Sequence, residues 1–83
     1  MDDNLVGKVV HYYDKIEVVI IRLEKPLKIG DKIKFVKDDN NSFEQTVDSM
    51  QIEHVQIDEG KKGQEVGIKV SQVAKEGTLV YLA

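Results

Sequence analysis

The sequence contains no cysteine, no tryptophan, a single proline and no long apolar run. Without cysteine, disulfides, thiolate metal ligands and cysteine nucleophiles are all excluded. The longest apolar run, from Val18 to Ile21, is far shorter than the roughly 20 residues that a membrane-spanning helix needs. The N-terminal stretch MDDNLVGK begins with acids and no apolar region follows it, so it does not resemble a secretory signal or a transit peptide. We therefore expect a cytoplasmic protein with no membrane partner.

The composition is typical of one small folded domain. Of the 83 residues, 41% are hydrophobic and 33% are charged, which is enough apolar material for a core and too much for a disordered tail. A chain of this length buries only about 60 to 65% of the surface that its unfolded form exposes. We expect a single domain over residues 1–83, with a small core.

Charge is distributed unevenly along the chain, although the net charge is only −3. Residues 25–37 hold five lysines and one acid, whereas residues 38–59 hold seven acids and no lysine or arginine. These charges are either the solvated faces of strands and turns, or a basic surface beside an acidic one. The lysines are Lys25, Lys28, Lys32, Lys34 and Lys37.

Alternation of apolar and polar residues predicts strands in the first half of the chain. The segments 5–13 and 15–23 are rich in β-branched and aromatic residues, and we expect them to form a hairpin. Pro26 lacks a backbone donor, so the second strand must stop or lie at a sheet edge there. In the segment 31–36, Ile33 and Phe35 should face inward, and the lysines between them outward.

The second half also predicts strands separated by turns. Helices could fit only at 56–62 and 73–76, and neither segment holds two turns of apolar residues at helical spacing. Turns are expected at 38–42 and 58–63, strands at 43–52, 64–70 and 77–82, and a bulge near Asp48-Ser49. About six short strands favour an all-β fold, and a small closed barrel over a sandwich, because closure removes exposed edges.

The strand that contains Val18 to Ile21 is apolar on both of its faces. A loop of the same chain, around Val73, could cover the outer face. Alternatively, Ile16, Val18 and Ile20 form an exposed stripe that docks a partner or a second copy of the chain.

No motif in the sequence indicates catalysis, a metal or a cofactor. His11 and His54 are far apart and have no second ligand at metal-site spacing, so we expect both at the surface. Ser49, His54 and Asp58 are the residue types of a Ser-His-Asp catalytic triad, but nothing in the sequence indicates an oxyanion hole. The GKKG stretch at 60–63 lacks the remainder of a phosphate-binding loop and is expected to be a hairpin turn. The prediction is a protein that is not an enzyme.

Tyr12 and Tyr13 are adjacent in a predicted strand. Neighbouring strand residues face opposite ways, so one ring should join the core and the other should be exposed. An exposed tyrosine could stack on a nucleic-acid base.

Three segments resemble the translation-factor β-barrel, which is the second domain of elongation factor Tu and related GTPases. LKIGDKIKFV (27–36) resembles the I-K-V-G-D-x-V-x-I segment of that family, and 47–70 resembles its D-E-x-x-x-G-x-x-V-G block. KEGTLVYL (75–82) is similar to its closing R-G-x-V-[LI]. A closely similar barrel ends the collagenase-like peptidases, and EQTVDSMQIEH (44–54) looks particularly like that version.

The resemblance implies a barrel and explains several glycines. Gly30-Asp31, Gly63, Gly67 and Gly77 correspond to turn and close-packing positions of the family. In both families the barrel accompanies a nucleotide-binding or catalytic domain, and no motif of such a domain is found in these residues. The resemblance therefore implies an accessory binding module with a translation-related role.

Two functions from different classes remain open. In the first, the barrel contacts RNA or a ribonucleoprotein: the five lysines bind phosphates and Tyr12 or Tyr13 stacks on a base. In the second, it is a protein-interaction or subunit module that docks a partner, or itself, through Ile16, Val18 and Ile20.

Overall fold

The computed structural model describes residues 4–38 and 41–83, and within these ranges every regular element is a strand. The predicted all-β fold is therefore confirmed. None of the described residues belongs to a helix long and apolar enough to cross a membrane. The strands are β1 (Leu5–Tyr13), β2 (Val18–Leu23), β3 (Leu27–Lys28), β4 (Lys32–Asp38), β5 (Asn41–Thr46), β6 (Gln51–Ile52), β7 (Val55–Gln56), β8 (Glu59–Gly60), β9 (Glu65–Lys69) and β10 (Leu79–Leu82).

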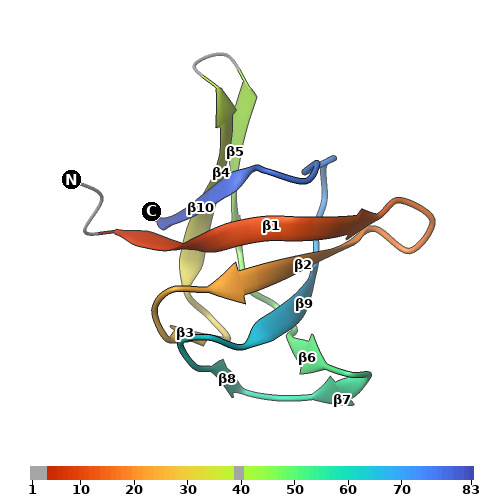
Figure 1. Cartoon of the computed structure of the whole chain (residues 1–83), viewed down its shortest axis with the longest axis vertical. Coiled ribbons are helices and arrows are strands. Elements are labelled where there is room, and N and C mark those ends of the chain that lie inside the picture. Colours follow the sequence, from red (N-terminus) through yellow and green to blue (C-terminus); the bar gives the residue numbers. More distant parts are fainter. Residues whose placement is uncertain (1–3, 39–40) are drawn as a thin grey trace.

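Eight of these strands form one curled antiparallel sheet, in the order β5-β4-β10-β1-β2-β9-β6-β7. Figure 1 shows β4 and β5 running across the direction of β1 and β2. A separate ribbon pairs β3 with β8. The first and last strands of the large sheet, β5 and β7, do not pair with each other, so the expected closed barrel is wrong in this respect. The strands at that end of the sheet, β6 and β7, are only two residues long each.

The predicted hairpin is confirmed as β1 and β2, joined by a turn over residues 14–17. A bulge in β1 sets the direction of its last side chains, because Val9 pairs with Ile21 whereas His11 pairs with Ile20. Val9 faces the core before the bulge, and Tyr12 packs against the core after it. Tyr13 is therefore the exposed tyrosine, as the prediction of one buried and one exposed ring requires.

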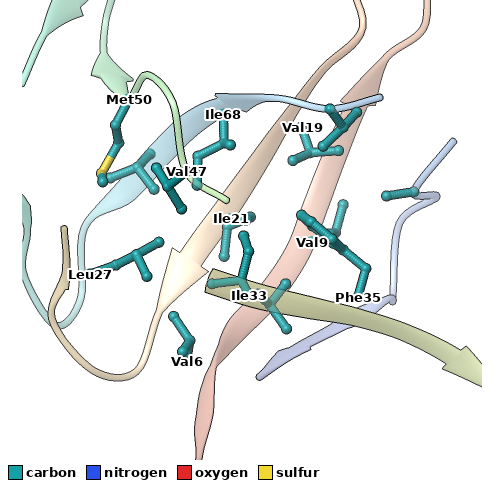
Figure 2. Close-up of a cluster of buried hydrophobic side chains, with 14 of the residues drawn as sticks. Val6, Val9, Val19, Ile21, Leu27, Ile33, Phe35, Val47, Met50 and Ile68 are labelled. Carbon is teal, nitrogen blue, oxygen red and sulfur yellow. The ribbon is translucent and has the colours of Figure 1, made fainter. Parts of the chain in front are cut away.

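Side chains from several strands meet in one apolar core (Figure 2). Ile33 and Phe35 of β4 are fully buried there, which confirms the inward parity predicted for this strand. The Phe35 ring stacks on Phe43 of β5, with 4.7 Å between ring centroids. The buried cluster consists of Val6, Val9, Val19, Ile21, Leu23, Leu27, Ile33, Phe35, Val47, Met50, Val66, Ile68, Val70, Ala74 and Val80.

The segment 43–52 is not one bulged strand. β5 ends at Thr46, residues 47–50 leave the sheet, and β6 begins at Gln51. The break lets Val47 and Met50, three positions apart, both reach the core. In place of the bulge expected near Asp48-Ser49, the structure has an interruption between β5 and β6. The turn predicted at 38–42 lies in part outside the described residues.

The glycines at 60 and 63 do not simply form a hairpin turn. Gly60 lies in β8 and is buried against the core. A Cβ at this position would lie 2.6 Å from Leu23 Cδ1 and 2.9 Å from Val66 Cγ1, so the packing leaves no room for a side chain. Gly63 lies in a turn with a φ of 88°, and Gly30 has a φ of 96°, so both fit the turn role that the resemblance implies.

Candidate functional site

A groove lies on the outer face of β2 and β9, beside the turn between β6 and β7. Its volume is about 340 Å³. We refer to it as the β2/β9 groove, and it is lined by Tyr13, Ile16, Val18, Ile20, Gln51, Glu53, His54, Glu65 and Gly67.

Strand register explains why these side chains meet. Residues directly opposite each other in paired strands project from the same face. Tyr13 is opposite Val18, and Gly67 is opposite both Ile20 on β2 and Gln51 on β6. Aliphatic and aromatic side chains of β1 and β2 therefore face the same side as the polar side chain of β6.

Gly67 forms the floor of the groove because it has no side chain. A Cβ there would lie 3.4 Å from Ile20 Cδ1, 3.5 Å from Val18 Cγ1 and 3.3 Å from Gln51 Cγ. These are tight but attainable packing distances, so any side chain at this position would occupy the hollow. This is the close-packing role expected of Gly67.

The structure brings together the three residues predicted as an exposed apolar stripe. Ile16 lies in the turn after β1 and is 57% exposed, and Ile20 is half-buried. Val18 is only 8% exposed, since Tyr13 and Lys69 lie opposite it on the strands at either side. Val73 does not line this groove and instead lines a second hollow. The use of the three residues for docking stays a prediction.

The rim of the groove is a two-residue turn that sequence reasoning missed. Ile52 and Val55 pair directly, so Glu53 and His54 form the whole loop of the β6–β7 hairpin. Their φ values are 50° and 67°. Hairpin loops with positive φ at both positions are usually Asn-Gly, because a Cβ is unfavourable in this region. Strained residues of this kind concentrate at functional sites.

The groove carries negative charge. Glu53 and Glu65 both line it, and lysine and arginine are absent from its lining. Arg22 Nη2 donates to Glu65 Oε2 at 3.2 Å, but both side chains are about half exposed or more, so the pair contributes at most about 1 kcal/mol. The Glu53 carboxylate has no hydrogen bond or ion pair to any of the described residues.

The lysines predicted to contact RNA are spread over β3, β4 and the turn before β3. Lys28 of β3 lies directly opposite Glu59 of β8 in the small ribbon. Lys32 Nζ lies 3.5 Å from Glu44 Oε1 on β5. Acids therefore lie among these cations, which are Lys25, Lys28, Lys32, Lys34 and Lys37. Their contact with RNA stays a prediction.

Lys37 belongs to a second hollow of about 490 Å³ at the β4–β5 end of the molecule. Its Nζ donates to the backbone oxygen of Glu76 at 3.3 Å. The half-buried ring of Phe43 and the side chain of Lys75 also line this hollow, whereas Tyr12 and Tyr13 do not. Neither of the tyrosines predicted to stack on a base therefore lines the same hollow as Lys37.

Both histidines are exposed, as the sequence indicated. His11 Nδ1 lies 3.1 Å from Glu76 Oε2, and the His11 ring meets the Tyr13 ring edge-on with centroids 4.3 Å apart. His54 is on the groove rim. Among the described residues, no three His, Asp or Glu side chains gather closely enough to hold a metal ion.

Comparison with known proteins connects the chain to peptidases. No protein-family model matches it. A Methanocaldococcus jannaschii protein named as an uncharacterised protease is 42% identical over 77 residues, which cover 93% of this chain. The match covers only 19% of that protein, so the chain spans about a fifth of the length of its curated relative.

Two solved structures share the fold, and both are of the C-terminal domain of a Geobacillus thermoleovorans protein named as a U32 peptidase. One matches with a TM-score of 0.89 and 17% identity, over 96% of this chain and 92% of that domain. Its selenomethionine variant matches with a TM-score of 0.87 and 18% identity, over 93% and 96%. The fold expected from the collagenase-like peptidases is confirmed. These comparisons do not show the translation-factor resemblance.

The expectation that the chain is not an enzyme is contradicted. The curated relative is named as a protease, and the solved domains belong to a protein named as a peptidase. The expectation rested on the absence of local motifs in the sequence. In the solved structures, the matching part is the C-terminal domain.

Proposed function

We propose that this chain is the β domain of a U32-type peptidase and that it docks polypeptide in the β2/β9 groove. The relationship to proteins named as peptidases supports a polypeptide as the ligand class. The fold supplies a curved surface on which a segment can lie.

One observation carries the proposal: Tyr13, Ile16, Val18 and Ile20 line one groove together with Gly67, which has no side chain to fill it. Apolar side chains that gather at a surface mark interaction sites. The volume of about 340 Å³ is near the lower end of the range for ligand sites, about 300 to 1,000 Å³. It suits a few side chains of an extended segment, and Gln51 offers an amide to the backbone of that segment.

The test is a measurement by calorimetry of how tightly a short capped peptide with a Leu-Val-Leu core binds to the 83-residue chain. Ile16→Ser should weaken binding severalfold, because it removes an exposed apolar contact in the groove. Ile29→Ser is the matched control, since Ile29 is also an exposed isoleucine, at 42%, but lies outside the groove. Equal affinities of the two variants would contradict docking in this groove.

Self-association is the other form of docking through Ile16, Val18 and Ile20. It predicts a dimer that appears with rising concentration in analytical ultracentrifugation and that Ile16→Ser dissociates. A monomer at every concentration would exclude this form.

Contact with RNA, with a translation-related role, is a second candidate function. The hollow beside Phe43 favours it, because a half-buried ring lines this hollow together with Lys37 and Lys75. RNA affinity should then fall steeply with salt as the lysines release counterions from the phosphates. No binding to single-stranded RNA at low salt would exclude this function.

A further inference from the structure

We propose that the β2/β9 groove selects polypeptide segments in which apolar residues lie next to lysine or arginine. This inference rests on the proposed docking function and specifies its ligand. It follows from the charge, the backbone conformation and the apolar lining of the groove.

The charge of the lining is the first argument. Glu53 and Glu65 are its ionisable acids, and no lysine or arginine is among the lining residues. Glu65 already pairs with Arg22 at the surface. The Glu65 carboxylate can therefore take a guanidinium partner, and an exposed pair of this kind is weak enough to be exchanged for a ligand cation.

The conformation of Glu53 is the second argument. Its φ of 50° holds it in the left-handed region, within a two-residue loop whose ends are paired in a ladder. Pairing on both sides of the loop therefore holds the backbone of Glu53 at the rim of the groove. Its carboxylate, without a partner among the described residues, is available at this position to an incoming cation.

The third argument is that lysine and arginine match both parts of the groove. Their aliphatic stems pack along apolar surface while the charged end reaches a polar group. Here the stem would lie over Ile20 and Gly67, and the charge would reach Glu53. The ring of Tyr13, 47% exposed, adds a surface on which a cation is favourable. An acidic segment would instead place like charges together, which opposes binding.

The experiment compares three capped peptides that share a Leu-Val-Leu core and differ only in their flanking residues. The flanks are lysine, glutamine or glutamate, and affinity for the 83-residue chain is measured by calorimetry at low and moderate salt. The lysine peptide should bind best and the glutamate peptide worst. The advantage of the lysine peptide should shrink as salt rises.

Variants locate the selectivity. Glu53→Gln should weaken the lysine peptide by about two- to fivefold, the range of an exposed ion pair, and leave the glutamine peptide unchanged. Glu59→Gln makes the same charge change on β8, outside the groove lining, and should leave the preference intact.

The outcomes separate this inference from the proposed function. If all three peptides bind equally in an Ile16-dependent manner, charge selection is wrong and docking stands. If Glu53→Gln and Glu59→Gln have the same effect, the selectivity comes from net charge and the assignment to Glu53 is wrong. If none of the peptides binds, docking itself is wrong.

Discussion

The side chain of Gln45 binds the backbone of Ser71 between strands that are not neighbours in the sheet. The Ser71 amide donates to Gln45 Oε1 at 3.1 Å, and Gln45 Nε2 donates to the Lys69 oxygen at 2.8 Å. The side-chain amide of Gln45 therefore donates one hydrogen bond and accepts another, as the backbone of a residue on an adjacent strand would. Because Gln45 lies on β5 and Lys69 on β9, these bonds hold the curled sheet together where it does not close.

Replacing Gln45 tests this role. Gln45→Ala should lower the free energy of unfolding by about 1 to 2 kcal/mol, since it removes two exposed hydrogen bonds to backbone groups. Denaturant unfolding measures the change. Gln56→Ala is the matched control on exposed strand β7 and should have little effect. Equal losses in the two variants would show that the bridge contributes nothing specific.

Gly60 should tolerate no side chain. Gly60→Ala forces a methyl group to within 2.6 Å of Leu23 Cδ1 in a packed core, and overpacking of this kind costs about 1 to 3 kcal/mol. The loss appears as a lower midpoint in denaturant unfolding. A variant as stable as the wild type would mean that the β3–β8 ribbon can move away from the core.

Gly67→Ala should separate stability from binding. The new methyl group meets its neighbours at 3.3 to 3.5 Å, and alanine is favoured over glycine within a strand, so stability should change by less than about 1 kcal/mol. The same methyl group fills the floor of the groove, and affinity for the lysine-flanked peptide should fall severalfold. Unchanged affinity would place the ligand elsewhere.

Substitutions in the rim turn should raise the stability of the protein and remove its preference for lysine-flanked peptides. The double variant Glu53→Asn and His54→Gly restores the residues that this loop conformation favours, and should raise the free energy of unfolding by about 1 to 2 kcal/mol. It also removes the rim carboxylate, so the preference for lysine-flanked peptides should disappear. If the variant keeps that preference, Glu53 does not set it.

The elements that sequence could predict are those fixed by local chemistry. The β1–β2 hairpin, the inward Ile33 and Phe35 and the turn at Gly30 follow from alternation and backbone preference alone. That the sheet stays open, with Gln45 bridging β5 and β9, could not be predicted, because it depends on the register between distant strands.

The candidate site was predictable only in part. The sequence indicated Ile16, Val18 and Ile20 as a candidate docking stripe, because both faces of the strand that contains Val18 to Ile21 are apolar. Gly67 and the rim turn were not assigned to the site, since they join it through pairing with β2 and through a loop that lacks Asn-Gly. The peptidase connection was carried in the sequence by the segment 44–54 alone, and similarity along most of the chain supports it.

Backbone amide chemical shifts of the isotope-labelled chain, titrated with the lysine-flanked peptide, test the central claim most directly. Docking in the β2/β9 groove predicts that the largest shifts occur at Tyr13, Ile20, Glu53 and Gly67. It also predicts that β4 and β5 stay unchanged. Shifts centred on β4 and β5, or no shifts at millimolar peptide, would contradict the account.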